Sequence, residues 1–460
     1  MKQVDLIIIG AGPGGYETAV MAAQAGLETV IIEANKVGGT CLNEGCIPTK
    51  CFCRNATLLN DLKEAEVYGI RDLSFNFDFK KVLERKNQVV ESLSSGIKTL
   101  LKHPSVTFVC GKAEFGDTPY IVTVPNACDV EGNAMEEKQY SAKNVIIATG
   151  SVTKFLPIEG AHLPGVYTST EMLDIDTVPE RLCIVGGGVI GLEFASIFNA
   201  FGSQVVVLEY CKEILPNFDA DIAKRLKQAL KSKGISFVNQ ASVQAIHTEN
   251  GQYSVSYEYK GKTESVQTDI VLMAVGRAAN IASLNFEQAG IVCDRRGVVT
   301  DEHYETNISG IYAVGDINGK CQLAHAATFQ GMYVLNRILG KENHTKMDIV
   351  PAAVFTCPEA TMVGKTEQQC KAEGIGFTVH KGFFRSNGKA LAMNEADGMV
   401  KILTDANEKI LGCHLFGPHA ADLIQEVATV MFKDGELQDL RNCIHAHPTL
   451  SEVIMNTAHN

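Results

Sequence analysis

The chain contains 460 residues, of which 45% are hydrophobic and 20% are charged, and its formal net charge at pH 7 is −12. This length is enough for about three domains with a large core that needs neither disulfide staples nor a structural metal. The acidic balance argues against general binding to nucleic acids or anionic membranes and favours small molecules or protein partners.

The N-terminal segment has the pattern of a dinucleotide-binding βαβ unit. An apolar strand over 4–9 is followed by Gly10, Gly12 and Gly15, then by a helical stretch and a second strand that ends at Glu33. Such glycines allow a tight turn, close approach of a pyrophosphate and packing of the helix on the strand. The pyrophosphate binds at the helix N-terminus, and the acidic residue binds the ribose hydroxyls. A single motif of this kind can also be an ordinary glycine turn.

Two cysteines five residues apart follow in the segment 38–50. Residues five apart on a regular helix are separated by about 7.5 Å of rise, whereas a disulfide requires a Cα separation of at most about 7 Å. If Cys41 and Cys46 bond, the segment is therefore not one straight helix, and Gly45 and Pro48 are residues that allow such an irregularity. We interpret the pair as a redox-active dithiol, while the spacing alone leaves open two buried structural thiols.

A second segment repeats the first pattern further along the chain. An apolar strand over 182–185 leads into Gly186, Gly188 and Gly191, and Glu209 follows Gly186 by the same 23 residues that separate Glu33 from Gly10. The repeat makes two dinucleotide-binding units the favoured interpretation. A carboxylate at the ribose position accepts bonds from a free 2′-hydroxyl and repels a 2′-phosphate, so Glu209 favours NAD over NADP.

Three further apolar runs end at glycines. They cover residues 145–149, 270–275 and 311–314, and each is typical of a buried strand in a parallel sheet. The third run leads to Asp316, and ligands of open α/β sheets bind where strands end.

The pattern changes from about residue 350 to strands that alternate with amphipathic helices, with strands expected over 399–403 and 410–416. We expect a separate C-terminal domain. The sequence His445-Ala-His447 is followed by Glu452. A histidine moves protons near neutral pH, and a carboxylate bonded to its other nitrogen orients the ring. Because the chain has 12 histidines, any single one of them is more often structural than catalytic.

The strings GGTCLNEGCIPTK, AVGD and HAHPTLSE, together with the two dinucleotide units, resemble the pyridine-nucleotide disulfide oxidoreductases, and most closely their dihydrolipoamide dehydrogenase branch. The resemblance covers essentially the whole chain. It implies an α/β fold with two Rossmann-like dinucleotide-binding domains, for FAD and NAD, and a C-terminal α+β dimerisation domain. We expect the FAD domain at 1–150 and 277–345, the NAD domain at 151–276 and the dimerisation domain at 346–460.

The resemblance also implies the residues that bind each cofactor. For FAD they are Gly10, Gly12, Gly14, Gly15, Glu33, Gly39, Thr40, Lys50, Ala113, Thr149, Gly150, Asp316, Leu323, Ala324 and His325. For NAD they are Gly186, Gly188, Val189, Ile190, Gly191, Glu209, Val243, Gly276 and Arg277. No metal site is expected.

The activity that the resemblance implies is oxidation of protein-bound dihydrolipoyl groups to lipoyl groups, with reduction of NAD+ to NADH. Cys41 and Cys46 would form the redox disulfide, with Cys46 on the flavin side. His447 would be the base and Glu452 its orienting group, acting on the dithiol of the other subunit of a homodimer. Lys50 and Glu193 would pair beside the flavin. Expected partners are lipoyl domains of a 2-oxoacid dehydrogenase complex or of the glycine cleavage system.

The cellular location follows from what the sequence lacks. No stretch reaches the roughly 20 uninterrupted apolar residues of a membrane span, and the N-terminus has no secretion-signal pattern. We therefore expect a cytoplasmic protein that binds neither membranes nor nucleic acids.

Other interpretations of the extra cysteines and of the function also fit the sequence. Cys51 and Cys53 stand where the family usually carries aliphatic residues; we expect core packing, with alternative disulfides as the other interpretation. The chain could reduce another disulfide or mercuric ion, act as a transhydrogenase, or be a scaffold flavoprotein in an acyltransferase complex. The absence of a paired C-terminal cysteine and of an N-terminal metal-binding module argues against mercuric reduction. A transhydrogenase would not need both Cys41 and Cys46, and the dithiol, Lys50 and the His447–Glu452 pair argue against a purely structural scaffold.

Overall fold

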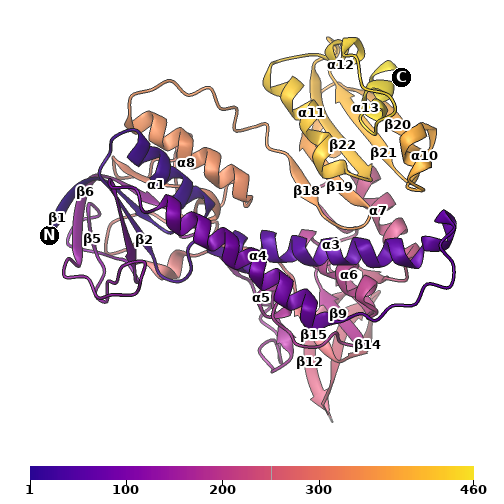
Figure 1. Cartoon of the computed structure of the whole chain (residues 1–460), viewed down its shortest axis with the longest axis horizontal. Helices are drawn as coiled ribbons and strands as arrows, with labels where there is room; N and C mark the ends of the chain where they lie inside the picture. The colour runs from indigo at the N-terminus through magenta and orange to yellow at the C-terminus, as the bar shows by residue number, and fades with distance from the viewer. Residues whose placement is uncertain (250) are drawn as a thin grey trace. The chain divides into compact units, whose positions relative to one another are not determined.

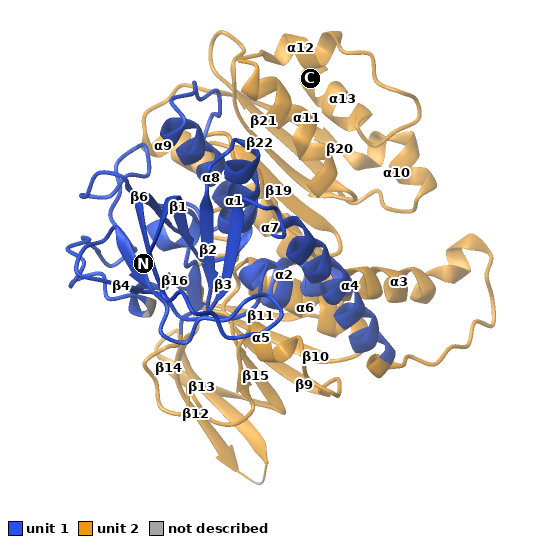
Figure 2. Cartoon of the chain, turned by 60° about the vertical axis from the view of Figure 1, so that its left-hand side comes forward, with its two compact units in different colours: residues 1–51, 81–154, 277–347 blue, residues 52–80, 155–276, 348–460 orange. Residues whose placement is uncertain are grey.

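The computed structural model describes residues 1–249 and 251–460, and these divide into two compact units. Unit 1 contains residues 1–51, 81–154 and 277–347, and unit 2 contains residues 52–80, 155–276 and 348–460 (Figure 2). Each unit is thus assembled from three separate stretches of the chain.

Unit 1 is built on a seven-stranded sheet. Its strand order is β3-β2-β1-β6-β5-β4, with β17 paired to β6. Strands β3, β2, β1, β6 and β17 run parallel, and β4 and β5 are antiparallel additions. The bounds are β1 Lys2–Ile9, β2 Thr29–Glu33, β3 Val106–Cys110, β4 Glu114–Phe115, β5 Ile121–Thr123, β6 Gln139–Ile147 and β17 Ile311–Ala313.

Helices and two short strands complete this unit. They are α1 Pro13–Gln24, α2 Gly39–Glu44, most of α4 Phe79–Leu100, α8 Ala324–Ile338, β7 Ser151–Thr153, β16 Arg277–Ala279, and the 3₁₀ turns η2 Ile281–Ser283 and η3 Gly315–Asn318. Strand β1 is buried on both faces: Leu6 and Ile8 face one core cluster, and Ile7 and Ile9 face another. Burial on both faces explains the continuous apolar run in the sequence. Helices α1 and α8 pack side by side (Figure 1).

Unit 2 contains a second parallel sheet, with strand order β11-β10-β9-β15-β8, and a three-stranded antiparallel sheet, β12-β13-β14. The bounds are β8 Val166–Tyr167, α5 Ser169–Met172, β9 Arg181–Val185, α6 Val189–Phe201, β10 Gln204–Glu209, α7 Ala220–Ser232, β11 Ser236–Asn239, β12 Ser242–Glu249, β13 Gln252–Tyr259, β14 Lys262–Thr268 and β15 Ile270–Met273. Unit 2 also contains η1 Ala65–Tyr68.

The C-terminal part of unit 2 is an antiparallel sheet with strand order β18-β19-β22-β21-β20. Helix α11 packs on β19 and β22, and α13 packs on β20 and β21. The bounds are β18 Ala352–Val354, β19 Glu359–Gly364, α9 Glu367–Ala372, β20 Thr378–Phe383, η4 Phe384–Ser386, α10 Gly388–Ala392, β21 Met399–Thr404, β22 Ile410–Gly417, α11 Ala420–Phe432, α12 Leu437–Asn442 and α13 Glu452–His459.

This architecture confirms the expected fold class, with two parallel α/β sheets and a C-terminal α+β part. The strands expected over 399–403 and 410–416 are present and are each one residue longer at the C-terminal end. The strand expected at 145 begins earlier, at Gln139, because its polar N-terminal half pairs with β5 as well as with β1.

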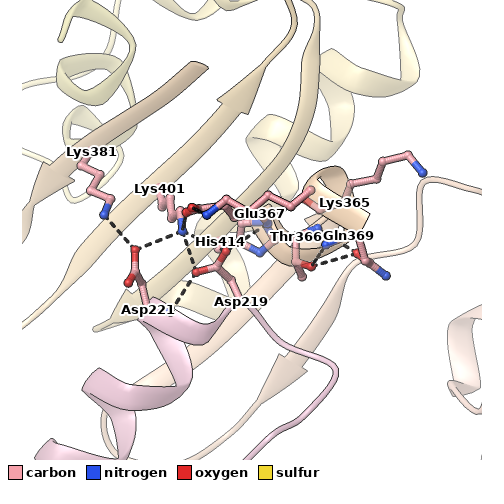
Figure 3. Close-up of polar contacts among 10 residues, drawn as sticks. Asp219, Asp221, Lys365, Thr366, Glu367, Gln369, Lys381, Lys401 and His414 are labelled. Atoms are coloured by element: carbon pink, nitrogen blue, oxygen red, sulfur yellow. Dashed lines mark hydrogen bonds and ion pairs between the residues drawn. The ribbon is translucent and has the colours of Figure 1, made fainter. Parts of the chain in front are cut away.

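A buried ion cluster ties α7 to the C-terminal sheet within unit 2 (Figure 3). The Nζ atom of Lys401 on β21 lies 2.9 Å from Asp219, 3.0 Å from Asp221 and 2.6 Å from Glu367. The side chains of Lys401 and Asp219 are only 1% and 0% exposed. Asp219 also caps α7, since its side chain accepts a hydrogen bond from the Asp221 N–H.

In the part of the chain that the structure describes, no helix combines the length and the apolar character needed to cross a bilayer.

Candidate functional site

The dithiol lies at a break between two helices. Cys41 is in α2, and Cys46 is the first residue of α3 (Cys46–Lys63). Their sulfurs are bonded, and their Cα atoms are 4.7 Å apart. Gly45 separates the helices with φ −145° and ψ −106°, so the segment is not one straight helix, as the sequence required for a bonded pair. The position of Cys46 at a helix N-terminus favours its thiolate, because the helix dipole stabilises negative charge there.

The first glycine-rich turn is closed too tightly for side chains. A Cβ atom on Gly15 would lie 1.8 Å from the Gly10 carbonyl oxygen. Gly10 has φ +108°, and a Cβ there would lie 2.3 Å from the Ala148 oxygen. The turn thus brings α1 directly onto β1, with the helix N-terminus at the end of the sheet.

The N-terminus of α1 is open to an anion. Its N-cap residue, Gly12, makes no side-chain capping hydrogen bond. Gly39 approaches so closely that a Cβ on it would lie 2.7 Å from the Gly12 Cα. A helix start with uncapped N–H groups fits a pyrophosphate.

Glu33 lies at the end of β2 beside this turn. Its carboxylate accepts hydrogen bonds from the Ala11 N–H, at 2.7 Å, and from the Asn35 N–H, at 2.8 Å. Burial raises the pKa of Glu33 above its usual value, against the lowering effect of these backbone donors. Each oxygen keeps acceptor capacity for a ribose hydroxyl.

The second glycine-rich turn, at residues 186–191, makes the same kinds of contact as the first. Glu209 accepts from the Gly187 N–H at 2.5 Å and from the Cys211 N–H at 2.6 Å. A Cβ on Gly191 would lie 2.0 Å from the Gly186 oxygen, and the N-cap of α6, Gly188, again has no side-chain cap. We call the two arrangements the first cradle (Gly10 to Gly15 with Glu33) and the second cradle (Gly186 to Gly191 with Glu209).

A partly buried polar network surrounds Asp316 in unit 1. Its carboxylate accepts from the Ser151 hydroxyl at 2.6 Å, and the Arg277 Nε donates to that hydroxyl at 2.7 Å. Burial raises the pKa of Asp316, while Ser151 and Arg277 oppose the rise. The Thr149 Oγ1 is buried without a hydrogen-bond partner among the described residues, as expected for an atom that a ligand would satisfy.

The network includes Arg277, which was expected to bind NAD. Arg277, which the sequence grouped with NAD, lies on β16 of unit 1, where β16 pairs with β7. Its NAD role therefore stays a prediction, and its observed partner is Ser151. Ser151 itself was missed, although it directly follows the glycine-terminated run at Gly150.

His447 and Glu452 form the expected pair. The His447 Nδ1 lies 2.9 Å from a Glu452 oxygen, and the other Glu452 oxygen accepts from the Thr449 N–H at 2.8 Å. These bonds lower the pKa of Glu452, the Thr449 amide having the larger effect. The His447 side chain is 80% exposed, so the second ring nitrogen remains open to a reactant.

His445 has a different environment. Its Nε2 lies 2.6 Å from a Glu426 oxygen, and its side chain is only 4% exposed. Burial lowers the pKa of His445, but Glu426 and the Cys443 carbonyl raise it, with a net rise. This is the geometry of a structural histidine.

The remaining predicted residues are distributed over both units. Lys50 lies in α3 within unit 1, and Glu193 lies in α6 within unit 2, so their pairing stays a prediction. Glu193 is 4% exposed and accepts from the Phe355 N–H at 3.0 Å. The other positions are Thr40 in α2, buried Ala113 after β3, Val189 and Ile190 in the first turn of α6, Val243 on β12, Gly276 before β16, and Leu323, Ala324 and His325 at the start of α8.

Comparison with known proteins places this geometry in context. The family described as pyridine nucleotide-disulphide oxidoreductase matches residues 4–331, and its dimerisation domain matches residues 350–458. Dihydrolipoyl dehydrogenase of Bacillus subtilis is 38% identical, with 99% of this chain and 97% of that protein covered. Leghemoglobin reductase of Glycine max is 35% identical, with 99% and 87% covered.

Solved structures show the same likeness. The HOCl-induced flavoprotein disulfide reductase RclA of Escherichia coli, in a Cu(II) complex, superposes with a TM-score of 0.87. Its sequence is 32% identical, and the match covers 100% of this chain and 99% of RclA.

Proposed function

Because the chain belongs to the pyridine nucleotide-disulphide oxidoreductases, we propose that it oxidises dihydrolipoamide to lipoamide and reduces NAD+ to NADH. The observation that carries the reaction type is the bonded Cys41–Cys46 pair at the start of α3. The substrate rests on full-length similarity to relatives named dihydrolipoyl dehydrogenase, which are 36% to 38% identical in three bacteria.

The cofactors are FAD and NAD(H). Bound FAD would supply the two-electron transfer between the dithiol and NAD+, the latter reduced by a hydride. We assign FAD to the first cradle and NAD to the second, where the Glu209 carboxylate would bind a free ribose 2′-hydroxyl and repel a 2′-phosphate. The Thr149 hydroxyl and Asp316 would add polar contacts on the FAD side.

The chain's own residues perform the thiol chemistry. His447, oriented by Glu452, takes the proton of one substrate thiol, and the resulting thiolate attacks the Cys41 sulfur. The Cys41–Cys46 bond breaks, and Cys46 leaves as a thiolate at the N-terminus of α3, where the helix dipole stabilises it. The second substrate thiol then attacks the mixed disulfide, which releases lipoamide and leaves Cys41 reduced.

The C-terminal segment is the family's dimerisation domain, which supports a homodimer. We propose that His447 serves the dithiol of the partner subunit, because its exposed ring leaves Nε2 free for a group outside its own hydrogen bond. Lipoyl domains of a 2-oxoacid dehydrogenase complex or of the glycine cleavage system are the proposed protein partners, and the cytoplasm is the proposed location.

A second candidate is reduction of a different disulfide or oxidant. It is favoured by the likeness to RclA, whose fold matches over the whole chain. The same dithiol, cradles and His447–Glu452 pair would serve such a reaction, so only the substrate separates the two functions.

The test is anaerobic titration of the purified protein with dihydrolipoamide, followed by NAD+ or NADP+. We expect dihydrolipoamide to reduce the protein, with a thiolate-to-flavin charge-transfer band, and NAD+ but not NADP+ to reoxidise it. Cys46→Ser should retain FAD and lose lipoamide-linked turnover, whereas the matched control Cys53→Ser on the same helix should keep it. Full turnover in Cys46→Ser would remove the assignment, and a protein that dihydrolipoamide does not reduce would favour the second candidate.

A further inference from the structure

Two cysteines outside the redox dithiol face each other in unit 1. Cys110 is the last residue of β3, and Cys128 lies after β5, at the start of a short hairpin that its bridge to Ala134 closes. They form an isolated antiparallel bridge, with the Cys110 N–H donating to the Cys128 oxygen at 2.7 Å and the Cys128 N–H donating to the Cys110 oxygen at 3.0 Å. Residues paired in this way have Cα atoms about 5.5 Å apart and side chains on the same face. A disulfide spans Cα separations of about 4.4–6.8 Å.

The Cys128 thiol lies beside the Cys110 backbone, and neither residue is fully buried. The Cys128 thiol donates to the Cys110 carbonyl at 3.6 Å. Burial raises the pKa of Cys110 to about 11, and the charge and hydrogen bond of Cys128 add to the rise. Both side chains are only partly buried, whereas Cys183, Cys370 and Cys413 are buried.

The pair is coupled to the first cradle through the sheet. Cys110 is in register with Glu33 on the neighbouring strand β2, and the next residue, Gly111, donates its N–H to the Glu33 carbonyl at 2.8 Å. The Glu33 carboxylate is close enough to contribute to the raised pKa of Cys110. A shift of the end of β3 would therefore act directly on Glu33, the residue proposed to hold the ribose.

We propose that Cys110 and Cys128 form a second, reversible dithiol–disulfide pair, which exchanges with low-molecular-weight disulfides and loosens the first cradle when oxidised. Opposed Cβ atoms in strand pairs lie about 4.5–5.5 Å apart, whereas a disulfide holds them at about 3.8 Å. Closing the bond draws the end of β3 toward Cys128 and strains its hydrogen bond to Glu33. The predicted effect on flavin binding rests on the proposal that FAD binds the first cradle. Formation of the Cys110–Cys128 disulfide does not depend on that proposal.

The exchange is balanced with oxidised glutathione as the oxidant. One protein thiol loses its proton and attacks the glutathione disulfide, which forms a mixed disulfide and releases one glutathione. The other protein thiol attacks the mixed disulfide and releases the second glutathione. Two electrons pass from the pair to glutathione, and the two thiol protons end on the released glutathione molecules. The raised pKa of Cys110 disfavours its thiolate as the first nucleophile.

The experiment equilibrates the FAD-loaded full chain in glutathione buffers of rising disulfide fraction, then traps free thiols by acid and alkylation. Peptide mass spectrometry should find a Cys110–Cys128 cross-link whose fraction follows the buffer ratio and disappears with dithiothreitol. Cys51 and Cys53 are the internal control, because residues two apart on a helix do not face each other. Released flavin fluorescence, measured in parallel, should rise faster for the oxidised than for the reduced protein.

Cys110→Ser and Cys128→Ser each remove the cross-link, and flavin release from both should become independent of the buffer. If one variant folds poorly, the other variant and the titration of the wild-type protein still test whether the Cys110–Cys128 disulfide forms and changes flavin release. Absence of the cross-link at every buffer ratio overturns the proposal. A cross-link that leaves flavin release unchanged overturns the link to the first cradle, and neither result depends on lipoamide turnover.

Discussion

The two acidic residues of the cradles show how one carboxylate can serve two partners. Glu33 and Glu209 each accept one backbone N–H per oxygen. These bonds fix the orientation of the carboxylate, so a ribose bound as proposed would meet acceptors that are already in place. Each carboxylate is thus held in place by the backbone of its own cradle.

At the same scale, the His447–Glu452 pair gives a separable kinetic prediction. His447→Gln should lower dihydrolipoamide oxidation by about 10²–10⁴-fold, the usual contribution of a general base. Glu452→Gln should have a smaller effect of the same sign, because it removes the carboxylate charge that orients the ring. Reduction of the protein by NADH should be unchanged in both variants, since no substrate thiol is deprotonated in that half-reaction.

Steady-state and rapid-reaction rates check this prediction. His445→Gln is the matched control, because His445 is held by Glu426 and is nearly buried, so its loss should affect stability rather than proton transfer. Normal dihydrolipoamide oxidation in His447→Gln would exclude that residue as the base.

At the scale of elements, each cradle depends on a helix packed directly onto a strand. Gly191→Ala would place a Cβ 2.0 Å from the Gly186 carbonyl oxygen, so α6 must shift from β9. We expect a loss of about 1–3 kcal/mol, the usual cost of overpacking. A Cβ on Gly188 would meet no atom within 4 Å, and its φ is −80°, so Gly188→Ala should keep the stability of the protein. It should lose NADH affinity, because the added methyl group would stand where the pyrophosphate of a cofactor bound as proposed would approach.

Thermal unfolding and NADH titration separate the two variants. The expected pattern is a lowered melting temperature for Gly191→Ala and a raised Kd with an unchanged melting temperature for Gly188→Ala. Equal stability of Gly191→Ala and wild type would show that α6 can move away from β9 at no cost.

At the scale of the whole molecule, non-contiguous segments are held together by buried charge. Lys401→Met would leave Asp219, Asp221 and Glu367 near one another without their shared cation. Removing one partner of a buried pair costs about 3–5 kcal/mol, so chemical denaturation should show a loss of this size. Lys381→Met is the control: its side chain is 41% exposed, and the loss should stay within about 1 kcal/mol. Equal losses of stability in the two variants would contradict the conclusion that the buried charge of Lys401 stabilises the fold.

The same cluster predicts an acid dependence of stability. Hydrogen bonds and charges from Lys381 and Lys401 outweigh burial and lower the pKa of Asp221 from 3.8 to about 2, and Lys371 and Lys401 lower that of Glu367. A carboxylate with a depressed folded pKa stabilises the fold above its unfolded pKa and loses that contribution as the pH falls through its folded pKa. We therefore expect stability to fall between about pH 4 and pH 2, with a shallower slope in Lys401→Met. The side chain of Asp221 is 42% exposed, so solvent screening reduces its contribution to this pH dependence. An identical slope in Lys401→Met would show that the acid sensitivity arises from other groups.

The sequence by itself determined the parts of this protein that are local in the chain. The glycine turns, the 23-residue spacing from Gly10 to Glu33 and the helix break between Cys41 and Cys46 depend on backbone geometry within a few dozen residues. The His447–Glu452 pair is also local, since only five positions separate His447 from Glu452, the first residue of α13. Local constraints of this kind are visible in residue type and spacing, and these predictions agreed with the structure.

The tertiary structure alone decided contacts between residues that are distant in sequence. Ser151 meets Asp316 across 165 positions, and Lys401 meets Asp219 across 182. Cys110 opposes Cys128 only because a hairpin pairs with the end of β3. The partners of a side chain in such contacts are set by how sheets and helices pack, which no periodic pattern encodes, so the position of Arg277 beside Ser151 and the burial of Lys401 could be found only in three dimensions.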